Sequence, residues 1–145
     1  MAVTAFFYGN AFLSAFNKEI DFNSDTIKVM LCTSAYTPSQ DTHQYKSSVT
    51  NEVTGTGYTA TGATLANCTL TYTAGTNVLK LDADDVSWAS STITARYAVI
   101  YDATPASDAT RPLLCYIDFG ENVSSTNGPF SITFDANGIA TVTVA

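Results

Sequence analysis

Short apolar runs separated by polar turns fill most of the chain, and many of them alternate between apolar and polar positions. In residues 68–83, Leu70 and Tyr72 alternate with threonines, the segment AGTN turns the chain, and apolar residues return at Val78. This period of two is typical of strands that bury one face, and two such runs joined by a short turn predict a hairpin. Residues 129–145 repeat the arrangement around an ANG turn and are predicted to form a second hairpin.

Two other runs carry apolar residues at successive positions. They are residues 25–33 (DTIKVMLCT) and 93–101 (ITARYAVIY). A short continuous apolar run is typical of a strand covered on both faces, so both are predicted to be central strands. A further strand is predicted in RPLLCYIDFG, residues 111–120, after a loop in which Pro105 and Pro112 stiffen the backbone.

One segment near the start changes period and predicts a helix. In residues 10–20 (NAFLSAFNKEI) the apolar positions fall on one helical face. These positions are Phe12, Leu13, Phe16 and Ile20. Asn10 is expected to cap this helix, which should lie across an open end or face of the β-structure and cover apolar surface there. Residues 1–9 are expected to form an N-terminal arm.

Together these patterns predict a mainly β protein. The chain has 145 residues and about eight predicted strands, roughly one every ten residues, a spacing expected of a β-sandwich or jelly roll. Charged residues make up only 13% of the chain, and threonine and serine take their place on exposed strand faces. We therefore expect one β-rich domain over residues 1–145, β-sandwich or jelly-roll-like, with one N-terminal amphipathic helix.

The chain is acidic, with 6 basic residues against 13 acidic ones and a formal net charge of −7. Nucleic acids and anionic membranes attract basic patches, so direct contact with either is not expected. No apolar run approaches the length of a membrane-spanning helix, and the apolar start lacks the basic region of a signal peptide. The chain is therefore expected to be made in a cytoplasm without a secretory signal.

Histidine and cysteine, the residues that most often carry chemistry, are few. His43 is the only histidine and lies in a long polar connection, residues 34–53, where an exposed loop histidine is expected. The three cysteines are expected to be small buried side chains, and a disulfide between two of them is left open. They are Cys32, Cys68 and Cys115.

Three aspartates, Asp82, Asp84 and Asp85, stand close together in the segment LDADDVSW. Clustered carboxylates can bind a hard cation such as calcium, but the spacing is not that of an EF-hand, and turn-forming aspartates are the preferred interpretation. Cation binding by these three is left open. No catalytic, cofactor-binding or metal-binding residue is assigned, and we expect a protein that is not an enzyme, although carboxylate pairs of the glycosidase kind can escape sequence patterns.

The remaining candidates are residues that could contact a partner. They are Phe6, Phe7, Tyr8, Tyr36, Tyr45, Asp108 and Arg111. Aromatic side chains are favoured anchors in interfaces, and the triplet at residues 6–8 either docks in the core of the chain itself or reaches a partner. Asp108 and Arg111 lie in the loop between two predicted strands, where they are expected to contact a partner.

Three parts of the chain carry a resemblance: DTIKVMLCTSAYTP at 25–38, VTNEVTGTGYTA at 49–60, and the pair ARYAVIYD at 95–102 and DFG at 118–120. These segments resemble those of a family of small virion proteins encoded among the head genes of tailed bacteriophages. The resemblance covers roughly residues 8–145. It implies a capsid decoration or cement protein, a β-rich module that binds the outside of the shell and bridges neighbouring capsid proteins.

The same resemblance implies the partners and the location. The major capsid protein would be one partner, and a second copy or two further copies of the chain would be the other, as a homodimer or homotrimer. The protein would be made in the cytoplasm of the bacterial host and would reside on the capsid surface of the virion. The family offers no catalytic residues to carry over to this chain.

Two other classes of function stay open on the sequence. A tail, neck or fibre component for host attachment would suit a threonine-rich β-module, but a fibre should show a trimeric repeat or a long extended start, and the chain shows neither. An enzyme acting on cell-surface glycans would need paired carboxylates at a defined separation.

Overall fold

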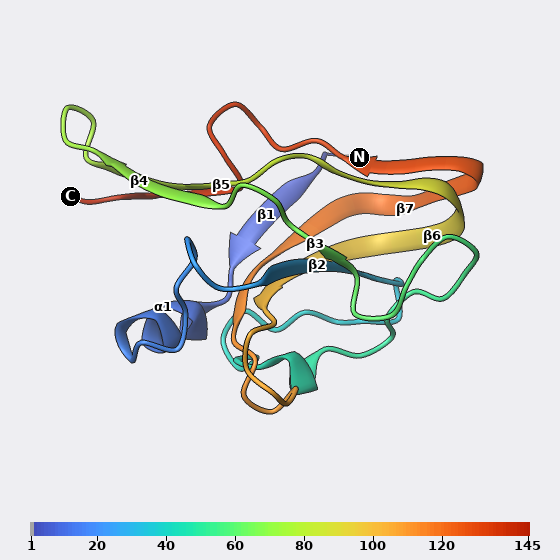
Figure 1. Ribbon diagram of the computed structural model, residues 1–145, viewed down its shortest axis with the longest axis horizontal. Helices are drawn as coiled ribbons and strands as arrows, with labels where there is room; N and C mark the ends of the chain where they lie inside the picture. The colour runs from blue at the N-terminus through green and yellow to red at the C-terminus, as the bar shows by residue number, and fades with distance from the viewer. Residues whose placement is uncertain (1) are drawn as a thin grey trace.

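A computed structural model describes residues 2–145 and shows, within them, eight strands in two antiparallel sheets and one short α-helix near the N-terminus (Figure 1). The elements are β1 (Thr4–Phe7), α1 (Gly9–Phe16), β2 (Ile27–Cys32), the 3₁₀ turn η1 (Lys46–Ser48), β3 (Ala63–Thr64), β4 (Thr69–Thr73), β5 (Val78–Asp82), β6 (Val86–Asp102), β7 (Leu113–Ile132) and β8 (Ala140–Thr143). The predicted mainly β, sandwich-like fold with an N-terminal helix is confirmed.

The long hairpin of β6 and β7 links the two layers. The first sheet has the order β1-β7-β6-β2-β3, and the second has the order β4-β5-β8. In Figure 1 the start of β6 and the end of β7 run in the upper layer, and both strands then bend back beneath it beside β2. Irregular pairing around Ser91 and between Ala95 and Tyr97 marks β-bulges, which increase strand bending and twist.

Two buried clusters lie on opposite faces of the first sheet. The main core lies between the layers and includes Val29, Leu31, Trp88, Ile100 and Phe130. The second cluster lies on the other face and includes Tyr8, Met30, Cys32, Tyr36, Val99 and Tyr101. Because successive side chains of a strand point to opposite faces, β2 and β6 contribute to both clusters. The prediction that these two are central strands is confirmed.

One predicted hairpin is confirmed and the other is wrong. The hairpin expected over residues 68–83 forms as β4 and β5. In contrast, the end of β7 pairs with β6, as in Phe130 opposite Trp88, while β8 pairs with β5. Only one local bridge, between Asp135 and Gly138, spans the expected turn. The alternation predicts which side chains share a face of a strand, but it does not predict the partner strand. β8 joins β5 because its apolar residues extend a face that β4 and β5 have already formed.

Helix α1 is shorter than the predicted helix over residues 10–20. Tyr8 rather than Asn10 occupies the N-cap position, and the Asn10 side chain donates instead to the carbonyl oxygen of Asp41 (3.4 Å). After Phe16 the chain leaves the helix, and Lys18 has a φ of 63°, in the left-handed region. A helix cannot continue through that conformation, so its last predicted turn does not form.

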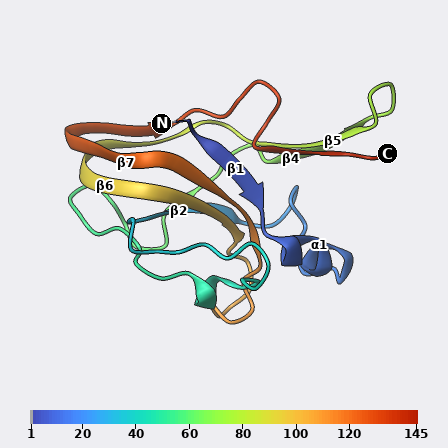
Figure 2. The same cartoon turned by 180° about the vertical axis from the view of Figure 1, so that it is seen from behind.

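Part of the expected N-terminal arm is an edge strand of the first sheet. Residues 4–7 form β1, which pairs with the start of β7 and leads directly into α1 (Figure 2). Met1 lies outside the described residues.

Candidate interaction surface

Tyr8 and Tyr36 are buried in the second core cluster and do not reach the surface. The Tyr8 hydroxyl lies 2.9 Å from the Tyr36 hydroxyl, which lies 3.0 Å from Nδ1 of His43. The backbone N–H of Ser39 donates to the same Nδ1 (3.4 Å), so this nitrogen acts as an acceptor. Burial lowers the pKa of His43 and raises the pKa of Tyr36 to about 12. His43 is thus half-buried and hydrogen-bonded rather than the exposed loop histidine predicted.

Phe6 and Phe7 divide between the surface and the interior. Phe6 is 40% exposed, and its ring stacks on Tyr116 with the centroids 5.3 Å apart. Phe7 is half-buried and packs against Phe12, with the ring centroids 5.0 Å apart. The two alternatives for the aromatic triplet therefore apply to different residues: Tyr8 docks in the core, and Phe6 remains accessible.

Asp108 and Arg111 hold their own loop against the rest of the chain. One carboxylate oxygen of Asp108 accepts from Nζ of Lys46 and the other accepts from Nη1 of Arg111, both at 2.8 Å. Arg111 also donates through Nε to the carbonyl oxygen of Pro105 (2.8 Å). The hydrogen bond from Lys46 lowers the pKa of Asp108, which keeps the carboxylate ionised. Both residues are therefore engaged within the chain.

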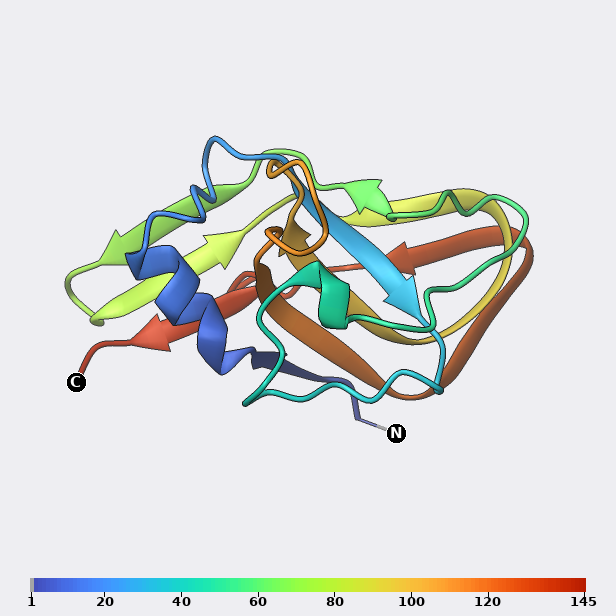
Figure 3. The ribbon, with the colours of Figure 1, turned by 90° about the horizontal axis from the view of Figure 1, so that it is seen from below.

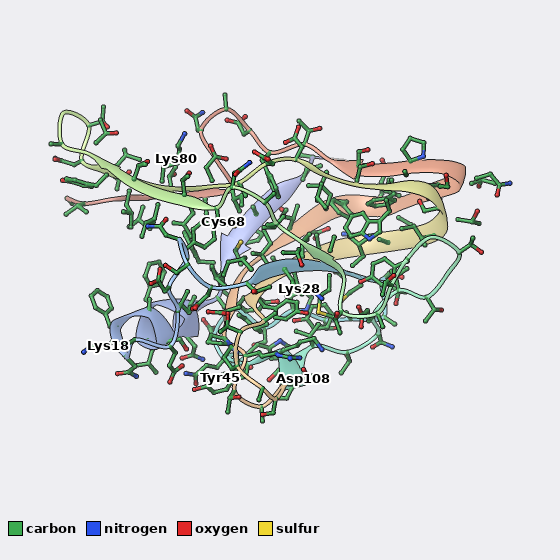
Figure 4. The ribbon with its side chains drawn as sticks, in the orientation of Figure 1. Lys18, Lys28, Tyr45, Cys68, Lys80 and Asp108 are labelled. Atoms are coloured by element: carbon green, nitrogen blue, oxygen red, sulfur yellow. The ribbon has the colours of Figure 1, made fainter. Side chains whose placement is uncertain are left out.

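Tyr45 lies beside this loop. Figure 4 labels Tyr45 and Asp108 at the same end of the molecule, beneath the first sheet. The Tyr45 hydroxyl donates to the carboxylate of Glu19 (3.2 Å) and accepts from the side-chain amide of Gln44 (3.2 Å). Seven residues were proposed for partner contact. The structure brings Tyr8 into contact with Tyr36, and Asp108 into contact with Arg111. It does not gather all seven on one surface.

A pair of carboxyl groups, Asp25 and Asp102, lies where β2 begins and β6 ends. Asp102 is fully buried, and its Oδ1 accepts from the backbone N–H of Thr104 (2.9 Å). Its Oδ2 has no hydrogen-bond partner among the described residues. Burial, and after it the neighbouring carboxyl of Asp25, raises the pKa of Asp102 to about 7. The pair can hold a proton, but Asp102 is closed to a substrate.

The aspartate cluster of the sequence separates into three independent contacts. Asp82 pairs with Lys80 (3.2 Å), Asp84 accepts from the side chain of Asn67 (2.6 Å), and Asp85 accepts from a backbone N–H. In residues 2–145 there is no cluster of three or more histidine, cysteine, aspartate or glutamate side chains that could hold a metal ion.

The three cysteines are all free. Cys32 and Cys115 are buried, as expected, and burial raises the pKa of each thiol to about 12. Cys68 is only partly buried. The disulfide that the sequence left open is therefore not formed, and the two buried thiols remain protonated at neutral pH.

The small sheet β4-β5-β8 has one apolar and one polar face. Its register aligns six apolar residues in two rows, Leu70–Leu81–Ala140 and Tyr72–Leu79–Val142. The threonines of β4 and β8 alternate with these residues and point to the opposite face together with Lys80. Figure 1 shows that this sheet projects past the first sheet, with α1 lying beneath it.

An open apolar cleft of about 230 Å³ lies between this sheet and α1. Residues from both sides line it, among them Phe12, Ala15 and Phe16 of α1 and Leu70, Leu79 and Val142 of the sheet. The helix was predicted to cover apolar β-structure, and it does so only in part, because the cleft between the helix and the sheet stays open. No charged side chain of the described residues lines the cleft.

Three large apolar side chains that line the cleft are exposed. Phe16 is 88% exposed, and Leu70 and Phe12 are each about 40% exposed. Apolar side chains that gather on the surface in this way typically mark an interaction site. The sequence placed Leu13 and Phe16 on one helical face, but it gave no sign that the face would stay open, because the chain segment opposite it is more than fifty residues away.

Comparisons of the chain with protein-family models, with curated proteins and with solved structures give no match. Among residues 2–145, none of the helices has the length and apolar character needed to cross a membrane.

Proposed function

We propose that this chain is a structural virion protein of a tailed bacteriophage, a capsid decoration or cement protein that binds the outside of the major capsid protein shell and stabilises it. Two lines of argument support the proposal. The segments at 25–38, 49–60 and 95–102 resemble those of small phage head proteins. The fold is a β-sandwich with an open apolar surface at one end, which is what a binding module requires.

The apolar cleft carries this proposal. Complete burial of one large apolar side chain contributes about 1.5–3 kcal/mol, and Phe16 alone is almost wholly available for such burial. A helix or loop of a capsid protein could enter the cleft and cover Phe16, Phe12 and Leu70 together. Attachment at several neighbouring sites on a shell would then multiply a modest affinity per site.

The charge distribution fits an outer position. With a net charge of −7 and only 6 basic residues, the chain carries little that would attract packaged nucleic acid. This low attraction for nucleic acid suits the face of the shell that points away from the genome. A role in binding and stabilising the shell needs neither a catalytic group nor a cofactor.

The first experiment locates the protein in purified particles and measures its copy number. A copy number that matches the shell subunits is the expected result. A small copy number at one vertex or along the tail would instead support the alternative, a tail, neck or fibre component. Particles that lack the protein should assemble but lose resistance to heat, chelation or internal pressure, and unchanged stability would overturn the cement role.

The second experiment tests the cleft directly. Isolated shells without this protein would be titrated with the wild-type chain, with Phe16→Ser and with Val123→Ser. Val123 is an exposed apolar residue of β7 and serves as the matched control. Loss of the Phe16 contact should weaken binding by roughly 10-fold or more, because about 1.4 kcal/mol corresponds to 10-fold. Equal binding of both variants and the wild type would exclude the cleft as the attachment site.

A further inference from the structure

The outer edge of β8 is an unpaired strand edge. The backbone N–H of Val144 donates to the carbonyl oxygen of Asn77 (2.8 Å), which makes these two residues a hydrogen-bonded pair. Hydrogen-bonded and non-hydrogen-bonded pairs alternate along an antiparallel ladder. The N–H and C=O groups of Thr141 and Thr143 therefore point away from β5. In residues 2–145 no further strand follows β8 in this sheet.

This edge lacks the features that usually protect exposed edges from pairing. Natural edge strands carry charges, proline or bulges, or they are covered by another segment. Residues 140–145 (ATVTVA) contain neither a charge nor a proline. At the opposite edge of the same sheet, the N–H of Leu70 is bonded to the side chain of Asn23 (2.8 Å), which partly closes β4. Figure 3 shows β8 as the outermost strand on its side of the small sheet.

The space beside β8 is open to another strand. A groove of about 270 Å³ separates residues 137–141 from β1. Ala140 and Thr141 of β8 line this groove together with Ala5, Phe6 and Phe7, so the end of a strand laid against β8 would meet the groove between β8 and β1.

We propose that two copies of the chain pair through this edge, antiparallel and centred on Val142, to form a dimer with a continuous six-stranded sheet. In this register Thr141 of one copy faces Thr143 of the other, and both residues present outward backbone groups. Two such pairs give four hydrogen bonds across the interface. A register shifted by one residue would place outward groups opposite inward ones and would mix the apolar and polar faces.

The side chains of β8 are self-complementary in the same register. Val142 meets Val142 of the second copy, and Ala140 meets the second copy's Val144, all on the apolar face. The threonines meet on the polar face, where β-branched residues and hydroxyl pairs favour cross-strand contact. Each copy carries a net charge of −7, but none of the paired residues is charged, so like charges do not meet along the strands.

The pairing gives the proposed function its self-interface. Opposite residues of an antiparallel pair lie on the same face of a sheet, so both α1 helices and both apolar clefts lie on one side of the joined sheet. A dimer would then present two clefts to one surface, and two linked sites bind more tightly than one. Only this consequence rests on the proposed function. The pairing of two β8 strands does not depend on a capsid, because it involves only two copies of this chain.

The test introduces a cysteine at the centre of the proposed interface. In the proposed register the two Val142 positions form a non-hydrogen-bonded pair with Cα atoms about 4.5 Å apart, within the range that a disulfide spans. Val142→Cys should therefore give a covalent dimer, twice the chain mass of 15.4 kDa, when an oxidant is added. Tyr72→Cys is the matched control, because Tyr72 lies in the same cross-strand row at the opposite edge. Equal cross-linking of the two variants, or none in either, would overturn the proposal.

A second measurement follows self-association without a cross-link. Thr73 and Thr143 lie in one cross-strand row on opposite edges of the small sheet, and both side chains are exposed on the polar face. In sedimentation analysis Thr143→Lys should weaken the dimer by at least about 10-fold, whereas Thr73→Lys should leave it unchanged. A wild-type chain that remains monomeric, or that forms trimers, would overturn the pairing. Because no shell is present, this result is independent of whether the chain binds a capsid.

Discussion

The carboxyl groups of Asp25 and Asp102 are neighbours at the junction of β2 and β6, where burial and the carboxyl of Asp25 favour a proton on Asp102. The two residues are 77 positions apart in the chain, and Asp102 is fully buried. The junction is supported by neighbouring backbone contacts, including the bond from the N–H of Ala103 to the carbonyl oxygen of Thr26 (2.8 Å). The junction therefore couples the position of both strands to the protonation of one carboxyl.

The first prediction concerns pH. The pKa of Asp102 is raised to about 7 in the folded chain, above the unfolded value near 4, so its proton stabilises the fold most at low pH. This contribution is lost as the pH rises through about 7. In Asp102→Asn an amide donates to Asp25 at any pH, so the free energy of unfolding at pH 8 should rise by roughly 1–3 kcal/mol. Denaturant unfolding between pH 5 and 8 would measure it.

The control for this prediction is Asp41→Asn, which removes one charge from an exposed aspartate away from the pair. Its unfolding free energy should keep the pH dependence of the wild type. If the unfolding free energy of Asp102→Asn kept the pH dependence of the wild type, the proton on Asp102 would not contribute to stability.

The second prediction concerns the hydrogen-bonded chain Tyr8–Tyr36–His43. Tyr36→Phe removes the hydroxyl that links the other two groups and leaves the buried Tyr8 hydroxyl without its partner. An unpaired buried polar group costs about 1–3 kcal/mol, so the midpoint of urea unfolding should fall accordingly. Tyr72→Phe, at an exposed tyrosine, should change stability by no more than about 0.5 kcal/mol. Equal effects of the two substitutions would contradict a structural role for the chain of hydroxyls.

The third prediction concerns the loop that follows β6. Asp108→Asn removes the charge that holds Lys46 and Arg111, and the Lys46 side chain is only 9% exposed. The cost should be about 1.5–3 kcal/mol, the range for hydrogen bonds to charged groups, and limited proteolysis should cut the loop faster. Asp82→Asn breaks the pair with Lys80, a lysine that is more exposed than Lys46, and should cost less than about 1 kcal/mol. A protected loop in Asp108→Asn would show that its backbone hydrogen bonds alone hold it.

The fourth prediction concerns the N-terminal segment. Deleting residues 1–8 removes β1, exposes the edge of β7 and takes Tyr8 out of the second core cluster. We expect a chain that is insoluble or unfolded, judged by soluble yield and circular dichroism. Deleting residues 1–3, which precede β1, should leave a folded protein. A soluble, folded chain without residues 1–8 would instead return the whole aromatic triplet to the surface as a partner contact.

The sequence by itself determined the period of the main strands and hence which side chains share a face. The period of two at Leu70 and Tyr72 and the continuous run at 93–101 are local properties, because each side chain's direction follows from its own strand, although the face of Leu70 and Tyr72 stays exposed. The hairpin of β4 and β5 was also predictable, since its two strands are joined by a short turn and need no distant partner.

Tertiary structure decided how strands that are distant in the chain pair and which side chains are enclosed. The alternation in β8 is compatible with pairing to β7 or to β5, and only the assembled sheet selects β5. The meeting of Asp25 with Asp102, the burial of Tyr36 and the open cleft beside Phe16 depend in the same way on contacts between distant segments. A repeating pattern encodes the orientation of a residue within its own strand, whereas the neighbour it meets is set by the packing of the whole chain.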